Sequence, residues 1–266
     1  MINNRSVFWI VNAALYFAFA SHSIAAGPQW AHEEQTTWGA IEDMTQSEVP
    51  HIYPFAECAI GNRQSPVDLA KAEVERVTEL NRLRIWYGAD TPTFYNSGHG
   101  IQVNTSLDYM GYLEVGNETY PLIQFHFHEP SEHVVGDKRF AAELHYVHIR
   151  EDGRLIVMAV AIEEGEANET FQTILDNIPS TAGEMREDTG IRIDPETLLP
   201  PDYHKPDFYT LAGSLTTPPC SEGVQWYLLK HAITVSSAQL DQLRSFYSQN
   251  VRMPQDLNGR TVLTTN

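Results

Sequence analysis

Two histidines separated by a single residue, His126 and His128, have the type and spacing needed to bind one metal ion. They lie in an alternating run, residues 122–128, which predicts a strand. Side chains two residues apart on a strand share a face, with α-carbons about 6.6 Å apart, so both imidazoles can converge on an ion about 2.1 Å from each nitrogen. Gln124 falls on the same face. The opposite, buried face is expected to carry Ile123, Phe125 and Phe127.

A third imidazole is available in a second alternating run, residues 143–149. Glu143 and His145 share one face of that run, so His145 can meet the first two histidines across neighbouring strands. Three neutral imidazoles leave the fourth position of a tetrahedral zinc ion open for water, as in catalytic rather than structural zinc sites. The two runs together predict a zinc site formed by His126, His128 and His145.

Seven motifs, taken in chain order, resemble those of the α-class carbonic anhydrases and extend over nearly the whole mature chain. They are residues 61–68 (GNRQSPVD), 96–100 (NSGHG), 124–128 (QFHFH), 131–133 (SEH), 142–145 (AELH), 213–219 (GSLTTPP) and 257–260 (LNGR). One such motif could arise by chance, but seven in family order could not. The chain resembles the bacterial, exported members of this family.

The resemblance implies an enzyme that catalyses the reversible hydration of carbon dioxide to bicarbonate and a proton, by attack of zinc-bound hydroxide. Zinc lowers the pKa of its bound water to about 7 in carbonic anhydrase, the established value for that family. Thr216 and Thr217 match the pair that orients the hydroxide: Thr216 accepts the hydroxide proton and donates its own to Glu132. Glu132 must then be ionised although buried, a state that this hydrogen bond makes tolerable.

The resemblance also implies outer partners for the ring N–H groups of the ligands, which hold the rings in place. The partners of His126, His128 and His145 are, in that order, the Gln124 side chain, the backbone carbonyl of Asn250 and the Glu143 carboxylate. Alternation independently places Gln124 and Glu143 on the ligand-bearing faces. Carbon dioxide is small and apolar, and four residues match the family's hydrophobic pocket: Val147, Val157, Leu215 and Trp226.

His99 matches the family's proton shuttle, because a histidine pKa near 6.5 suits proton transfer at neutral pH. Its neighbours Ser97, Gly98 and Gly100 predict an exposed and mobile loop. His133 is expected to be buried near Glu143. By resemblance His148 is also expected to be buried as a packing group, and no role is assigned to His32, His51, His204 and His231.

The first 25 residues are typical of a secretory signal, with Arg5 in a short polar start, an apolar run over 7–20, and a cleavage point after Ala25 or Ala26. The apolar run is shorter than the roughly 20 residues that span a bilayer, which disfavours a membrane anchor. The rest of the chain has no linker or repeat and suffices for one core. We expect one domain, residues 27–266, in the periplasm or secreted.

The chain is strongly acidic, with 17 basic and 35 acidic residues and a net charge of −18. Removing Arg5 with the signal leaves 16 against 35, or −19. Such a surface disfavours nucleic acid and anionic membranes as partners, and no membrane insertion of the mature chain is expected. The expected partners are carbon dioxide and bicarbonate, with sulfonamide and anion inhibitors by family resemblance; a homodimer is left open.

Both cysteines, Cys58 and Cys220, remain in the exported chain, where an oxidising compartment favours a disulfide. The resemblance implies the same, since cysteines in these two contexts pair in bacterial members of the family. The bond would tether the segment after residues 216–219 to the N-terminal region, and the loop-entropy model gives about 5 kcal/mol as an upper figure. Two free buried thiols are the alternative.

Strand-like runs over 83–86, 101–103, 120–128, 141–149, 155–162 and 224–229 predict a mainly β protein. Helical signals are few: helical spacing over 171–178 before Pro179, and a capping box that begins at Ser236. Periodicity does not supply the architecture. The family resemblance implies a large, mostly antiparallel, twisted central sheet with small peripheral helices in a single domain.

Four positions depart from the family pattern. Glu129-Pro130 stands where many members have tryptophan, and it resembles the bacterial form. Leu211 and Ala40 stand where tyrosines are common, which puts the outer hydrogen-bond network in doubt. Met253 alters the usual Arg-Pro-x-Gln ending, so the register around Asn250 is uncertain.

Three other functions fit parts of the pattern. His126, His128 and Glu132 match the first half of a cupin metal motif, which would make the protein an iron or manganese oxygenase, but Tyr120 replaces the required glycine. A non-catalytic carbonic anhydrase-like binding module would typically lack a ligand histidine. A periplasmic zinc-binding protein would lack the paired threonines.

Overall fold

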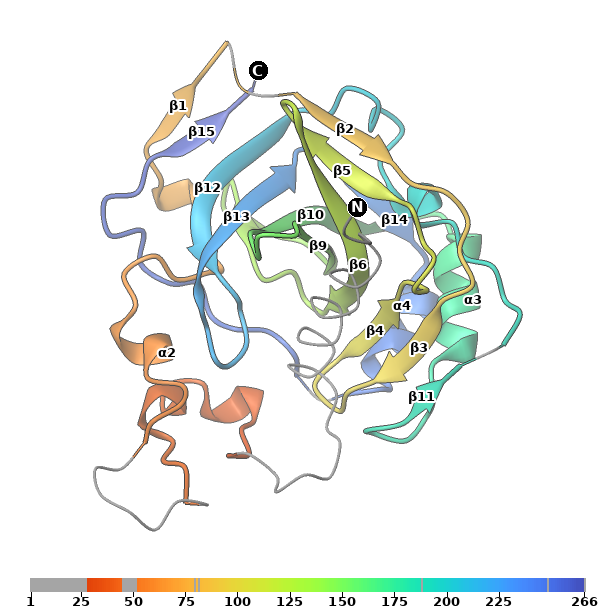
Figure 1. Cartoon of the computed structure of the whole chain (residues 1–266), viewed down its shortest axis with the longest axis horizontal. Helices are drawn as coiled ribbons and strands as arrows, with labels where there is room; N and C mark the ends of the chain where they lie inside the picture. The colour runs from red at the N-terminus through yellow and green to blue at the C-terminus, as the bar shows by residue number, and fades with distance from the viewer. Residues whose placement is uncertain are drawn as a thin grey trace, which may run out of the picture.

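A computed structural model describes residues 28–44, 52–78, 80, 82–187, 189–247 and 249–265. The predicted signal segment therefore lies outside the described residues. This part of the chain is organised around one large sheet of 13 strands (Figure 1). The strands are β1 (Val74–Arg76), β2 (Leu83–Trp86), β3 (Thr93–Asn96), β4 (Ile101–Asn104), β5 (Tyr112–Val115), β6 (Glu118–His128), β9 (Ala142–Ile149), β10 (Leu155–Glu164), β11 (Met185–Arg186), β12 (Phe208–Ser214), β13 (Glu222–Leu229), β14 (Ile233–Val235) and β15 (Val262–Thr264). A separate two-stranded sheet consists of β7 (Val134–Val135) and β8 (Lys138–Arg139).

The sheet is mixed, in the order β1-β15-β12-β13-β10-β9-β6-β4-β3-β11, with β14 beside β10 and β5 joining β2 to β6. Its parallel pairs are β1 with β15, β10 with β13, and β10 with β14. The β-rich prediction is confirmed and most strand pairs are antiparallel, but the sheet is mixed, because β10 pairs in parallel with β13 at its centre. That pairing depends on the long connection that carries the chain through β11 and β12, which strand periodicity does not reveal.

Helices are short and peripheral. They comprise α2 (Glu57–Ile60), α3 (Glu169–Asn177), α4 (Ser237–Arg244) and the 3-10 helices η1 (His32–Glu34), η2 (Trp38–Ala40), η3 (Leu69–Lys71) and η4 (Pro195–Leu198). Among the described residues no helix is long and apolar enough to cross a membrane. The predicted capping box is confirmed: the Ser236 hydroxyl accepts from Gln239 N, and Gln239 Oε1 accepts from Ser236 N. Gln239 also bonds the backbone of Asn168, the N-cap of α3, and so joins the two helices that lie side by side in Figure 1.

The two faces of the central strands bury two different apolar clusters. One cluster packs Phe125 and Phe127 against α3, where the Phe127 and Phe171 rings meet edge to face at 5.0 Å between centroids. The other cluster contains Val147, Val157 and Trp226, and lies on the face that carries His145. His145 therefore lies on one face of the sheet, and aromatic side chains pack against α3 on the other face.

Strict alternation fails at one point of β6. The pairing register with β9 shifts between Leu122 and Gln124, a β-bulge that adds one residue to β6. As a result Leu122 joins the aromatic cluster, whereas Ile123 packs against the cluster on the other face. The prediction that Ile123 shares the buried face of Phe125 is therefore wrong, but the bulge lies before Gln124 and leaves the positions of the two histidines unchanged.

Candidate metal centre

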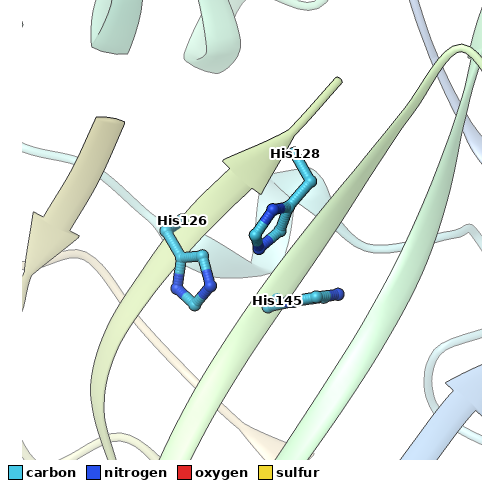
Figure 2. A group of neighbouring side chains, drawn as sticks. All are labelled: His126, His128 and His145. Atoms are coloured by element: carbon cyan, nitrogen blue, oxygen red, sulfur yellow. The ribbon is translucent and has the colours of Figure 1, made fainter. Parts of the chain in front are cut away.

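The three predicted histidine ligands meet on one face of the sheet. His126 and His128 project from β6, and His145 is the residue directly opposite His126 on β9. Their ring centroids are 4.5 to 5.2 Å apart. One nitrogen from each ring lies within 4.8 Å of the other two, and Figure 2 shows the three rings close together. The strands thus bring three imidazoles within reach of a single ion.

Hydrogen bonds fix which nitrogen of each ring faces the centre. Gln124 Oε1 lies 2.8 Å from His126 Nδ1, and the Asn250 carbonyl lies 2.6 Å from His128 Nδ1. These acceptors require a proton on Nδ1 and leave Nε2 of both rings as the lone-pair nitrogen. His145 is turned the other way, because its Nε2 donates to Glu143 Oε1 at 2.7 Å and its Nδ1 is left free. All three predicted outer partners are in place.

Asn250 is held by its own side chain. Its amide group donates to the carbonyl of Phe127 at 2.7 Å and accepts from the backbone N–H of Glu129 at 2.9 Å. The amide thus pairs with the chain on both sides of His128, as a neighbouring strand would. This contact fixes the register that the altered ending at Met253 left uncertain.

Burial keeps the three rings neutral. It lowers the pKa of His128 to about 4 and that of His145 below its usual value. Burial, together with His128 and His145, lowers the pKa of His126 well below 6.5. Nε2 of His128 is buried and has no hydrogen-bond partner among the described residues, an uncommon state for a buried polar atom. Neutral imidazoles with open nitrogens are the form that binds a divalent transition metal, so the residues present fit such an ion.

His133 completes the network behind His145, as predicted. Its backbone N–H and its Nδ1 donate to the two oxygens of Glu143 at 2.9 and 2.7 Å. Burial alone would raise the pKa of Glu143, but the His133 imidazole and the hydrogen bonds from both rings hold it well below its usual range. His133, Glu143 and His145 could also be considered a second metal-binding group. The carboxylate oxygens are already taken by N–H donors, so this group is a hydrogen-bond network that orients His145.

Glu132 lies next to the histidines and is fully buried. Its Oε1 accepts from the backbone N–H of Arg252 at 2.8 Å, and its Oε2 lies 3.6 Å from Nε2 of His128. Burial raises the pKa of Glu132 to about 7, against the opposing effects of His145, the Arg252 N–H and the Thr216 side chain. Thr216, the predicted partner of Glu132, is thus close enough to the carboxylate to lower its pKa. Thr217 follows and is half-buried. Its backbone carbonyl accepts a hydrogen bond from the backbone N–H of Cys220 at 2.8 Å.

Three of the four predicted pocket residues form one row across three strands. Val147 pairs with Val157, which in turn pairs with Trp226 on β13. The Trp226 ring contacts His145 edge to face, with 4.9 Å between centroids. Leu215, half-buried, packs against the same cluster. The site therefore has an apolar wall on the side of β10 and β13.

His99 lies differently from the prediction. Its ring stacks on Trp30 at 3.9 Å between centroids with 14° between planes, and the side chain is half-buried. The prediction that His99 is exposed is thus wrong for its ring, because a tryptophan distant in sequence covers it. Burial lowers the pKa of His99 below 6.5, and Glu33 acts in the opposite direction.

The predicted disulfide between Cys58 and Cys220 is present. Next to it lies Arg252, a buried residue that sequence analysis did not assign. Its guanidinium donates to the Gln64 side chain at 2.8 Å and to the carbonyls of Ser65 and Cys58 at 2.9 and 3.0 Å. Arg252 thus connects the disulfide segment to Glu132. Only its charge in an otherwise apolar neighbourhood could have indicated a buried role.

The comparisons with known proteins agree with this geometry. A family model described as eukaryotic-type carbonic anhydrase matches residues 46–266, which is most of the chain. The chain belongs to the carbonic anhydrase family. A carbonic anhydrase of Pectobacterium atrosepticum is 35% identical over 94% of this chain and 95% of its own, and one of Neisseria gonorrhoeae is 35% identical over 95% and 96%. The solved α-carbonic anhydrase of Thermovibrio ammonificans, in complex with sulfanilamide, is 34% identical, with a TM-score of 0.78, and covers 90% of this chain and 100% of its own.

Membership of the carbonic anhydrase family argues against the cupin alternative, in which Glu132 would bind the metal. The carboxylate instead lies beside the three histidines, where its Oε1 accepts a hydrogen bond from the backbone N–H of Arg252. Of the two replaced tyrosines, Leu211 is buried in the apolar cluster beside Trp226 and Ala40 is exposed. Neither of these two residues leaves a polar group near the histidines.

Proposed function

We propose that this carbonic anhydrase is a zinc enzyme that catalyses the reversible hydration of carbon dioxide to bicarbonate and a proton. The observation that carries the proposal is the convergence of three neutral imidazoles, each fixed by an outer hydrogen bond. His126 and His128 would hold zinc through Nε2, and His145 through Nδ1. Three nitrogen ligands with one open position suit a catalytic zinc ion. When bound, zinc makes hydroxide available near neutral pH, as is known for carbonic anhydrase itself.

Thr216 would orient the nucleophile. A hydrogen bond from Thr216 to the neighbouring Glu132 would direct the hydroxyl proton toward the carboxylate, so that the hydroxyl oxygen could accept the proton of the attacking group. The remaining lone pair of that group then points at the substrate. Glu132 must stay ionised for this, and a cation held by the neighbouring histidines would lower its pKa. The hydrogen bond from the backbone N–H of Arg252 also favours the ionised form of Glu132. Thr217 would act with Thr216 in orienting the nucleophile.

Val147, Val157, Leu215 and Trp226 would receive the substrate. Carbon dioxide carries no N–H or O–H donor, and an apolar wall excludes competing water without offering a strong hydrogen bond. The row of Val147, Val157 and Trp226 lies beside His145, so the substrate would meet the nucleophile at the edge of the cluster.

His99 would carry away the proton released at each turnover. The stack on Trp30 defines one position of its ring. Since burial lowers its pKa below 6.5, the imidazole readily gives up to buffer any proton that it takes from the site.

Metal analysis tests this proposal. The purified protein should contain one zinc ion per chain, lose hydration activity when a chelator removes zinc, and regain it when zinc is restored. The His145→Ala variant should bind zinc weakly under the same conditions. Stoichiometric iron or manganese without zinc in the active protein would contradict the proposal.

We also propose that residues 1–25 are removed after Ala25 or Ala26 and that the enzyme domain, 27–266, acts in the periplasm or outside the cell. The charged start and apolar run of the segment support export. The disulfide also supports it, because such bonds persist in oxidising compartments. Intact mass measurement of protein from the periplasmic and culture fractions should show the cleaved chain, and an intact chain confined to the cytoplasm would contradict export.

A further inference from the structure

His32 is a buried histidine to which no role has been assigned. It begins η1 and lies in an aromatic group with Trp30, Trp38 and His99. Its ring meets that of His99 edge to face, with 6.0 Å between centroids. The Gln35 side chain donates to the carbonyl of His32 at 3.0 Å and to that of Val251 at 3.3 Å, and Val251 follows Asn250, whose carbonyl holds the His128 ring. His32 thus contacts the predicted proton acceptor and lies on a segment tied to the one that orients a metal ligand.

The Nε2 atom of His32 has no hydrogen-bond partner in the part of the chain that the structure describes, although the side chain is only 2% exposed. Most buried polar atoms are paired with protein or with an ordered water, because an unpaired one loses the free energy of its hydration. A purely structural residue at this position would not need a nitrogen, since the contacts with the two tryptophans are ring contacts. The unpaired nitrogen therefore indicates an ordered water, the usual partner of a buried polar atom that no protein group satisfies.

We propose that Nε2 of His32 positions an ordered water through which the proton released at the metal centre reaches His99. The inference rests on the proposed hydration of carbon dioxide. The water accepts the released proton and gives one of its protons to the His99 ring, so that the water is regenerated and His32 is unchanged. His32 is thus a positioning residue for the proton step. Burial supports this passive role, since it lowers the pKa of His32 to about 3 and keeps the imidazole neutral at pH 7.

Oxygen-18 exchange between bicarbonate and water separates the two steps in the zinc-loaded protein. It reports the interconversion of carbon dioxide and bicarbonate and, separately, the proton-dependent release of labelled water. In His32→Phe, which retains an aromatic ring, we expect labelled-water release to fall on the order of tenfold, less than the full effect of an acid–base group. Interconversion should change less than about twofold in the same variant, because the water acts only on the proton step. The exposed His231→Phe is the matched control and should change neither rate.

A second readout does not depend on activity. A crystal structure of the wild-type zinc protein should show a water within about 3.2 Å of His32 Nε2, and the His32→Phe structure should lack it while retaining the Trp30 and His99 stack. Unchanged release of labelled water in folded, zinc-containing His32→Phe would overturn the inference. A wild-type structure in which a protein group makes a hydrogen bond with His32 Nε2 would also overturn it. If the wild-type protein shows no interconversion of carbon dioxide and bicarbonate, the proposed function itself has failed. This outcome differs from failure of the His32 inference, in which interconversion is present and labelled-water release is unchanged by the substitution.

Discussion

The backbone carbonyl of Asn250 accepts a 2.6 Å hydrogen bond from Nδ1 of His128, a ligand 122 residues earlier in the chain. The side chain of Asn250 holds that carbonyl in place by bonding the backbone on both sides of His128. The orientation of a ligand on β6 therefore depends on the C-terminal segment, and the amide of Asn250 is the connection between them.

Replacing Asn250 with alanine tests that connection. Loss of both amide hydrogen bonds frees the carbonyl to move, so the zinc affinity should fall roughly 10- to 100-fold, the usual effect of removing an outer partner. Competition with a chromogenic chelator measures this affinity. Asn117→Ala, at an exposed turn position, is the control. Equal zinc affinity in the two variants would show that the Asn250 side chain does not position His128.

Thr216→Val keeps the shape of the side chain and removes its hydroxyl. Without the bond to Glu132, the attacking group loses its orientation, and kcat/KM for carbon dioxide hydration should fall on the order of 10²-fold. Zinc content should stay at one per chain, since Thr216 is not a ligand. Thr173→Val, whose hydroxyl bonds only the helix backbone at Glu169, provides the control. A Thr216→Val enzyme with wild-type kcat/KM would remove Thr216 from the mechanism.

His99→Ala should slow proton export and leave the hydration step intact. We expect kcat in weak buffer to fall roughly 10- to 100-fold, while kcat/KM changes little, because only kcat contains the proton transfer. Added imidazole should restore much of the lost kcat by replacing the missing ring in solution. Stopped-flow assays at several buffer concentrations measure both quantities, and a kcat independent of both the substitution and imidazole would refute the role of His99.

His148 makes the stability of the fold depend on pH. It is fully buried on the face opposite His145 and accepts a 2.6 Å hydrogen bond from the Tyr87 hydroxyl, and burial lowers its pKa to about 3. The unfolded chain binds a proton here below pH 6.5 and the folded chain does not. The free energy of unfolding should therefore fall as pH decreases from 6.5 toward 3, by up to about 1.4 kcal/mol per pH unit for this proton.

Urea unfolding at pH 7, 6 and 5 measures this dependence. The ligand histidines titrate in the same direction, so the comparison of interest is with His148→Gln, whose side chain does not titrate and can still accept from Tyr87. The loss of stability between pH 6.5 and 5 should be smaller in this variant than in the wild type. Identical slopes would show that His148 does not contribute.

The sequence was sufficient for the parts of the site that lie on regular strands. Alternation correctly placed His126, His128 and His145 on facing positions, because β6 and β9 are regular there and a side-chain period of two needs no tertiary information. It failed at Ile123, where a bulge adds a residue without any change in hydrophobic pattern. The sequence also did not predict which nitrogen of each ring faces the metal site, since this depends on the hydrogen-bond partner of the other nitrogen.

Contacts between segments distant in sequence account for the remaining differences between the predictions and the structure. The Trp30 ring covers His99, and Arg252 donates to Glu132, yet neither residue lies in a periodic element that would indicate its position. The parallel neighbours β10 and β13 are likewise set by the path of the intervening chain. Local patterns predicted the strands, and tertiary packing determined what lies next to the metal centre.

Stopped-flow hydration of carbon dioxide by zinc-loaded protein, titrated with an aromatic sulfonamide, tests the central claim most directly. We predict acceleration well above the buffer rate, abolished when one equivalent of sulfonamide per zinc has bound and equally abolished by chelation. A folded protein with one zinc per chain that gives only the buffer rate would contradict the account.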